Sequence, residues 1–240
     1  MRILVVNDDG IRSEGIIELA RLAQSIGEVT VAAPSEQHSG MSQSITLTNH
    51  LTARRVSFPL EGVTAYSVDG TPADCVMTAI GGFLEQKPDL VLSGINKGYN
   101  TGTDILYSGT IGACMEALVH RIPAIAFSIG KDYTSFDLVR KHFHELMEYA
   151  LQNPAGPDAV WNINFPDCDS SQAKGILYDR EPAQIEFFGA DTYEVCGDRN
   201  GEFFLRPKVS MPTDGPDSTD MQAVLRKYIS VGKVHSMVMK

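Results

Sequence analysis

The sequence predicts an α/β fold with a mostly parallel sheet, and two stretches carry this prediction. Residues 3–6 (Ile-Leu-Val-Val) form an apolar, β-branched run that is too short for a helix and is typical of a strand buried on both faces. Residues 89–96 repeat this design, because a short apolar run again leads into small and polar residues. An apolar run, a helical pattern and a second apolar run follow one another within residues 3–33, which predicts a β-α-β unit with parallel strands and a right-handed crossover.

The composition limits the classes of protein to which this chain can belong. Its 240 residues suffice for one large domain or a domain with an extension, and 43% hydrophobic residues predict a packed core rather than disorder. A net charge of -10 argues against a general electrostatic grip on a nucleic acid polymer. The four scattered cysteines contain no C-x-x-C pair, which excludes a zinc cluster of that type and a dense disulfide framework. With no signal-peptide pattern and no apolar run near the ~18 residues of a membrane span, we expect a cytoplasmic protein without membrane contact.

The first helix follows the acidic residues that end the first strand. Apolar residues recur at helical spacing over residues 13–27, with Ser13 as the expected cap and Gly27 as the expected end. Residues 29–33 predict the second strand, which Pro34 interrupts. The polar, hydroxyl-rich segment 35–49 is longer than a simple connection requires, and loops of this length are often functional.

The next elements are an edge hairpin and a clearly marked helix start. Residues 51–68 alternate enough between polar and apolar to predict a hairpin at the edge of the sheet. Thr71 is the expected helix cap, Pro72 the first helical residue, and Asp74 an acid in the first turn. We therefore interpret Asp74 as a structural cap rather than a reactive group.

The remaining pattern continues the α/β order and then changes character after Pro166. Residues 123–127 and 159–165 predict strands, and residues 136–151 predict an amphipathic helix. Beyond residue 166 we expect short strands, a type I′ hairpin at Asn200-Gly201, a short helix over 218–228 and a final strand. We interpret the chain as one domain, with a catalytic core at 1–166 and a hairpin-rich extension at 167–240 that serves in oligomer contacts.

Several groups of polar residues follow predicted strands. Because parallel strands end at one edge of a sheet, ligands of such folds bind there, and these groups are expected to meet. Two carboxylates, a hydroxyl and an amide oxygen form a hard-oxygen site suited to Mg²⁺ or Mn²⁺, and a helix N-terminus beside it favours phosphate oxygens. This combination predicts phosphoryl chemistry with water as acceptor. The groups are Asp8 with Asp9; Ser39, Gly40 and Ser42; Asn96; and Ser108, Gly109 and Thr110 at a helix start.

Each group also has an ordinary explanation. Asp8 and Asp9 fit equally well a solvated Asx turn that caps the following helix. A hydroxyl-rich loop is usually only a loop, and a Ser-Gly-Thr sequence before a helix is usually only a cap. Their shared topological position is what favours a common site.

The motifs at these positions resemble those of the SurE family (survival protein E), in the same order and over almost the whole chain. They are Val6-Asn7-Asp8-Asp9-Gly10; Ala33-Pro34; Ser39-Gly40-Met41 with Ser44-Ile45-Thr46; Gly70-Thr71-Pro72-Ala73-Asp74-Cys75; Ser93-Gly94-Ile95-Asn96 with Gly98 and Asn100; Asp104 with Tyr107-Ser108-Gly109-Thr110; Asn162 with Asn164-Phe165-Pro166; and Thr219-Asp220 with Ala223-Val224.

The resemblance implies a Rossmann-like three-layer sandwich and a metal-dependent 5′-nucleotidase that acts on nucleoside 5′-monophosphates, with 3′-monophosphates and short polyphosphate as further substrates of some members. It implies one Mg²⁺ or Mn²⁺ per subunit, and a homodimer or homotetramer with an exchanged C-terminal element. The implied metal ligands are Asp8, Asp9, Ser39 and Asn96. The implied phosphate or substrate contacts are Gly40, Ser42, Asn96, Ser108, Gly109 and Thr110.

Within this hypothesis Asp8, Asp9 and Asn96 carry the chemistry. One aspartate accepts a proton from metal-bound water, while Asn96 and the helix start at 108–110 stabilise the developing charge. The sequence leaves open whether Asp9 attacks phosphorus directly instead.

Three other functions fit less well. A haloacid-dehalogenase-type phosphatase needs Asp-x-Asp, whereas these acids are adjacent. A dinucleotide-binding oxidoreductase needs G-x-G-x-x-G in the first turn, which is absent. A non-catalytic nucleotide or metal sensor on the same scaffold remains the alternative.

The chain departs from the family pattern at a few positions. Ser42-Gln43 stands where Gly-His is frequent, and Tyr99 where Pro is common. Lys227 replaces a usual Gly, and residues 231–235 lack the usual Thr-Pro segment. The first departure concerns the mouth of the site, and the last two concern oligomer contacts.

Overall fold

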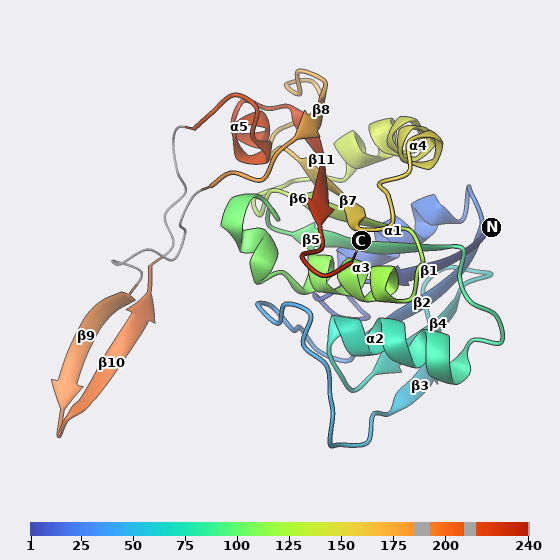
Figure 1. Cartoon of the computed structure of the whole chain (residues 1–240), viewed down its shortest axis with the longest axis horizontal. Helices are drawn as coiled ribbons and strands as arrows, with labels where there is room; N and C mark the ends of the chain where they lie inside the picture. The colour runs from blue at the N-terminus through green and yellow to red at the C-terminus, as the bar shows by residue number, and fades with distance from the viewer. Residues whose placement is uncertain (185–192, 209–214, 240) are drawn as a thin grey trace.

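The computed structural model of the chain describes residues 1–184, 193–208 and 215–239. A nine-stranded sheet forms its centre, with helices packed on both faces (Figure 1), so the predicted α/β three-layer architecture is confirmed. Six neighbouring strands run parallel to one another, from β4 through β2, β1, β5 and β6 to β7. The order across the sheet is β3 (Ala53–Val56), β4 (Thr64–Val68), β2 (Glu28–Pro34), β1 (Arg2–Val6), β5 (Leu90–Lys97), β6 (Ala124–Ile129), β7 (Ala159–Phe165), β11 (Ile229–His235) and β8 (Ile176–Arg180).

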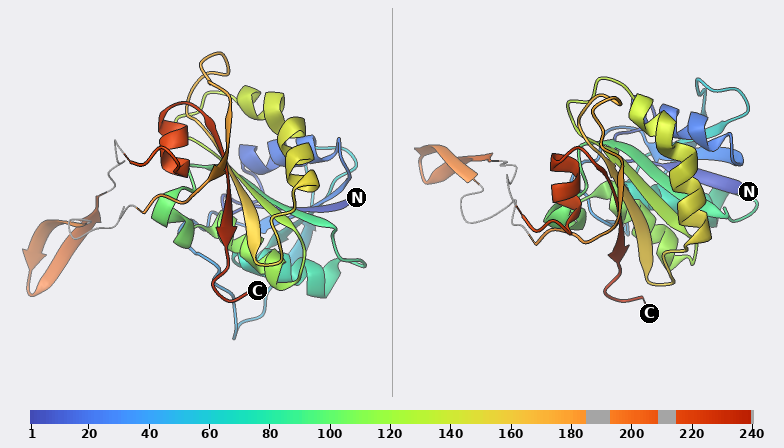
Figure 2. Two further views of the ribbon diagram at one scale, coloured as in Figure 1. Left: turned by 45° about the horizontal axis from the view of Figure 1, so that its top comes forward. Right: turned by 90° about the horizontal axis from the view of Figure 1, so that it is seen from above.

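The helices divide between the two faces, as Figures 1 and 2 show. α1 (Glu14–Ala23) and α4 (Asp137–Gln152) cover one face, and α2 (Pro72–Thr78) and α3 (Gly109–Val119) cover the other. The alternation of side chains along β1 explains its continuous apolar run, because Ile3 and Val5 join the core under α1 while Leu4 and Val6 join the core under α3. The prediction of a strand buried on both faces is confirmed.

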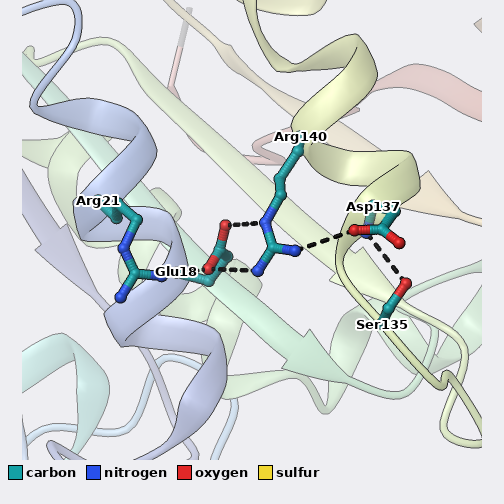
Figure 3. Close-up of polar contacts among 5 residues, drawn as sticks. All are labelled: Glu18, Arg21, Ser135, Asp137 and Arg140. Carbon is teal, nitrogen blue, oxygen red and sulfur yellow. Dashed lines mark hydrogen bonds and ion pairs between the residues drawn. The ribbon is translucent and has the colours of Figure 1, made fainter.

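An ion-pair cluster joins α1 to α4. Glu18 is 3% exposed, and the guanidinium of Arg140 donates to both of its carboxylate oxygens, at 2.7 and 3.0 Å (Figure 3). Arg21 donates a further bond of 2.7 Å to the same carboxylate. These bonds hold the pKa of Glu18 below its usual value, with the hydrogen bond from Arg140 as the main cause.

The helix starts were predicted more accurately than the helix ends. Ser13 caps α1 by accepting a bond of 3.3 Å from Ile16 N, as predicted. The prediction that Gly27 ends this helix is wrong, because α1 ends at Ala23 with Gln24 as its cap. Gly27 serves a different purpose: a Cβ at this position would lie 2.3 Å from the carbonyl oxygen of Met1, so only glycine permits the close approach of the two segments.

The predicted edge hairpin and its following helix are both present. β3 pairs antiparallel with β4 and forms one edge of the sheet. Thr71 and Asp74 form a reciprocal capping box at the start of α2, with Pro72 in its first turn. The structural role predicted for Asp74 is therefore confirmed.

Residues beyond 166 contribute both to the main sheet and to a separate hairpin. β11 pairs antiparallel with β7 and parallel with β8, and α5 (Asp220–Leu225) contacts this part of the sheet. β9 (Tyr193–Arg199) and β10 (Glu202–Pro207) form the predicted hairpin, with positive φ at both Asn200 and Gly201 as a type I′ turn requires. The hairpin extends away from the body of the molecule (Figures 1 and 2). Its use in oligomer contacts stays a prediction.

Candidate active site

The turn after β1 is made by Asn7, not by the two aspartates. The Asn7 side chain accepts a bond of 3.2 Å from Gly10 N and donates bonds of 3.0 Å to Gly10 O and 2.7 Å to Ser13 Oγ. Gly10 adopts a φ of 94°, in the region that favours glycine. Because Asn7 supplies the Asx turn and Ser13 caps α1, neither role occupies Asp8 or Asp9.

Asp8 lies almost fully buried against the start of α3. It is 5% exposed, and Thr110 Oγ1 donates a bond of 2.8 Å to its Oδ1. Burial and the adjacent charge of Asp9 raise the pKa of Asp8 to about 6, against the lowering effect of the bonds from Thr110. A buried carboxylate beside a second one is the environment that a cation would stabilise.

Asp9 is held by groups from two other segments. Lys97 N donates a bond of 3.2 Å to one oxygen, and Gln37 Nε2 donates a bond of 3.2 Å to the other. The same Gln37 amide donates a bond of 3.0 Å to Ser39 Oγ, and so joins the predicted ligands Asp9 and Ser39. Burial is the main cause that raises the pKa of Asp9 above its usual value. Gln37 is a site residue that was not predicted, since no periodicity distinguishes it from its polar neighbours in the 35–49 loop.

Predicted residues from separate segments meet in one cleft, whereas Asp9, Gly109 and Thr110 are not among its described lining residues. Asp8, Ser39 and Asn96 line a cleft of about 250 Å³ at the carboxyl ends of the parallel strands. The Asn96 amide donates a bond of 3.0 Å to Gly98 O, which leaves its carbonyl oxygen available for a ligand. The other lining residues are Gly40, Lys97, Tyr99, Asn100, Asp104, Tyr107 and Ser108.

The donor set fits a hard divalent cation. It offers two carboxylates, a hydroxyl and an amide carbonyl, which are the oxygen ligands that Mg²⁺ and Mn²⁺ prefer. Within the described parts of the chain, no three His, Cys, Asp or Glu side chains gather as a possible metal site. A cation in this cleft would therefore depend on the neutral oxygens of Ser39 and Asn96 as well as on the two acids. These ligand assignments stay predictions.

The first turn of α3 lies against Asp8, at the place where phosphate contacts are predicted. Ser108 caps the helix by accepting a bond of 3.1 Å from Ile111 N. A Cβ at Gly109 would lie 2.9 Å from the Asp8 Cβ, so glycine is required where the helix start meets the acidic strand end. Thr110 directs its hydroxyl to Asp8 and thereby positions that acid. Phosphate contacts of Ser108, Gly109 and Thr110 stay predictions.

Main-chain and side-chain bonds fix the loop that carries Ser39 and Gly40. Ser42 donates from its N to Tyr107 O at 2.9 Å and from its Oγ to Leu106 O at 2.8 Å. Among the described residues, Ser42 is not one of those that line the cleft. Its contact with substrate stays a prediction. Thr46 donates both its N and its hydroxyl to the carboxylate of Asp74, at 2.9 and 2.7 Å. The helix cap Asp74 therefore also anchors this loop, a role that its local sequence does not reveal.

A buried group of amides holds the glycine-rich loop after β5. Asn164 Oδ1 accepts a bond of 2.8 Å from Asn100 N, and Asn162 donates a bond of 2.8 Å to Asn100 O. The Asn100 side chain donates a bond of 2.8 Å to Ser128 Oγ. Two strands, β6 and β7, thus fix the path of the loop past the cleft, and the polar residues of the Asn162-x-Asn164 motif have a structural explanation.

Comparisons with known proteins point to one family. Residues 3–184 match the family described as Survival protein SurE. A protein of Carboxydothermus hydrogenoformans named 5′-nucleotidase SurE is 38% identical over 241 residues, covering 98% of this chain and 90% of the relative. A protein of the same name from Alkaliphilus metalliredigens is 36% identical over 242 residues, covering 98% and 92%. The crystal structure of the SurE protein from Aquifex aeolicus superposes with a TM-score of 0.80 at 35% identity, covering 98% of this chain and 93% of that one. Among the described residues, no helix is long and apolar enough to cross a membrane.

Proposed function

The chain belongs to the SurE family, and we propose that it is a 5′-nucleotidase that hydrolyses nucleoside 5′-monophosphates to nucleoside and phosphate in the presence of a divalent metal ion. One observation supports this proposal above the others. Asp8, Ser39 and Asn96 line a single cleft with Ser108, so a hard-oxygen donor set adjoins a helix N-terminus suited to phosphate.

The chain's own residues divide the work of the proposed reaction. A bound Mg²⁺ or Mn²⁺ supplies Lewis-acid charge and lowers the pKa of a coordinated water. Asp8, Asp9, Ser39 and Asn96 would hold this ion, and one of the two aspartates would accept the proton of the attacking water. The N-terminus of α3, from Ser108 to Thr110, would orient the phosphoryl oxygens and stabilise their charge in the transition state.

The finer features of the function rest on the resemblance to the family. Our proposal for this chain also includes one metal ion per subunit, activity on 3′-monophosphates and short polyphosphate, a cytoplasmic location, and assembly into a homodimer or homotetramer. The exposed apolar side chains of the β9–β10 hairpin support self-association, because a cluster of apolar side chains in water is typical of a surface that another protein molecule covers. They are Tyr193, Val195, Phe203, Phe204 and Leu205.

The deciding experiment measures phosphate release from 5′- and 3′-nucleoside monophosphates with added Mg²⁺ or Mn²⁺ and again after EDTA. We expect release that needs metal and that exceeds release from a generic phosphoester. Asp9→Asn should retain nucleotide binding and lose at least about 10²-fold in turnover, because either acid role of Asp9 requires its carboxylate. Nucleotide binding by the wild-type protein without release under any metal condition would instead favour the sensor.

A further inference from the structure

We propose that Asp104 is the general acid of the reaction and gives its proton to the nucleoside oxygen as the phosphorus–oxygen bond breaks. This inference rests on the proposed function and adds a third acid, with a separate task, to the two at the end of β1.

The chain geometry brings Asp104 into the reaction cleft. Asp104 lies in a short 3₁₀ helix, Gly102–Leu106, and lines the cleft together with Asp8, Asn96 and Ser108. Tyr107 N donates a bond of 3.0 Å to Asp104 O, so the chain turns from this acid straight into the start of α3. Asp104 therefore belongs to the wall of the cleft next to the predicted phosphate-binding turn.

Contacts with α5 hold the first residues of this 3₁₀ helix in place. Asp220 on α5 accepts a bond of 2.9 Å from Gly102 N, and Thr101 donates its hydroxyl to the sulfur of Met221 at 3.6 Å. A Cβ at Gly102 would lie 3.1 Å from Ala183 O, which shows how closely this segment packs. A group on such a support is held in place before substrate arrives.

Asp104 differs from the other acids of the site because one of its carboxylate oxygens has no donor within the described part of the chain. Its Oδ1 is buried and has no hydrogen-bond partner among the described residues, whereas Asp8 and Asp9 both accept hydrogen bonds. An ionised carboxylate in this position loses hydration without compensation, so burial raises the pKa of Asp104 to about 6. A protonated carboxyl has no such penalty, and it can donate to a substrate oxygen.

A bound substrate would also favour the protonated form of Asp104. The negative charge of a bound phosphate would oppose ionisation of the Asp104 carboxyl group. On the far side, the carboxylate of Asp220 lies against the same helix. The titratable groups lining the cleft with Asp104 are Asp8, Lys97, Tyr99 and Tyr107.

The reaction has a use for such a group. The oxygen of the attacking water forms a bond to phosphorus, and the bond from phosphorus to the nucleoside oxygen breaks with its electron pair left on that oxygen. An alkoxide is a poor leaving group, since its basicity resembles that of hydroxide (water has a pKa of about 15.7). The proton of Asp104 converts it to the alcohol, while Asp8 or Asp9 takes one proton from the water, so charge and atoms balance.

The test compares two substrates whose leaving groups differ in basicity. Asp104→Asn should lose about 10²- to 10⁴-fold in kcat/KM for a nucleoside 5′-monophosphate. With p-nitrophenyl phosphate, whose phenolate leaves without a proton, the loss should stay within about tenfold. Asp169→Asn is the matched control, because Asp169 is exposed and lies outside the cleft. Asp104→Glu should recover part of the nucleotide rate, and thermal unfolding of each variant reports whether it folds.

The outcomes separate the two proposals. If the wild-type protein hydrolyses nucleotides and Asp104→Asn loses the same factor with both substrates, the acid role is wrong and Asp104 only supports the site. If the wild-type protein releases no phosphate from any nucleotide, the proposed function itself fails, whatever Asp104→Asn does with p-nitrophenyl phosphate.

Discussion

Gly112 offers a direct test of the contact that positions the 35–49 loop. Gly112 lies one turn into α3, where the helix meets the backbone of Ser42 and Gln43. A Cβ in Gly112→Ala would lie 2.0 Å from the carbonyl oxygen of Ser42, 2.5 Å from its carbonyl carbon and 2.9 Å from Gln43 N. All three atoms are backbone, so no side-chain rotation relieves the clash.

The size of the disturbance follows from these distances. An ordinary carbon–oxygen approach is about 3.3 Å, so the loop must move by roughly 1 Å. Ser42 is bonded to the main chain of Leu106 and Tyr107, and Ser39 lies only three residues away. A misplacement of about 1 Å in a site can cost about 10²-fold in rate, whereas overpacking costs about 1–3 kcal/mol of stability. We therefore expect a large loss of activity in a protein that still folds.

The assay pairs metal-dependent phosphate release with urea unfolding. Gly112→Ala should lose about 10²-fold in kcat/KM. Gly82→Ala is the matched control, because no atom lies within 4 Å of a Cβ at that position. Full activity of Gly112→Ala, with the free energy of unfolding unchanged, would show that the loop tolerates the displacement and would refute this reasoning.

Two further predictions concern stability. Glu18→Gln weakens the bonds from Arg140 and should cost about 1–3 kcal/mol at pH 7, less than a fully buried pair because Arg140 is half exposed. The pKa of Glu18 is lowered in the folded state, so the stability that its carboxylate contributes is present above the unfolded pKa of about 4.3 and is lost as pH falls through the folded pKa. If urea unfolding gives the same difference in free energy between Glu18→Gln and the wild-type protein at pH 7 and near pH 3, this prediction is contradicted. Thr46→Val removes the hydroxyl bond of 2.7 Å to the buried Asp74 and should destabilise the protein by about 1–3 kcal/mol. Thermal unfolding should therefore show a lower Tm than that of the wild-type protein, with Thr46→Ser as the control that keeps the hydroxyl. A Tm of Thr46→Val equal to that of the wild-type protein would contradict this prediction.

The sequence was most informative where local chemistry and topology agree. The run at residues 3–6 predicted a strand buried on both faces, and the capping residues Ser13 and Thr71 marked helix starts, because caps are local contacts. The convergence of Asp8, Ser39 and Asn96 followed from the rule that parallel strands end at one edge. None of these inferences required knowledge of side-chain contacts.

Contacts between distant segments were beyond this kind of inference. Gln37 joins Asp9 to Ser39, and Asp74 anchors Thr46, yet neither pairing leaves a periodic or compositional signal. The end of α1 was misplaced at Gly27 because a glycine that ends a helix and a glycine that permits close packing look alike in sequence. The place of the final strand, β11, in the main sheet likewise depends on long-range pairing with β7.

Burial is the main cause that raises the pKa of Asp8, Asp9 and Asp104, and the three acids differ in the other groups that act on them. The pKa of Asp8 depends partly on the charge of Asp9, so a cation held by both would favour their ionised forms. The pKa of Asp104 is raised by burial alone. A cation bound to Asp8 and Asp9 would therefore offset the effect of the Asp9 charge on Asp8, which is second to burial, while leaving the burial of Asp104 in place. Two acids that bind a cation and accept a proton, and a third that retains one to donate, form the complementary set that ester hydrolysis requires.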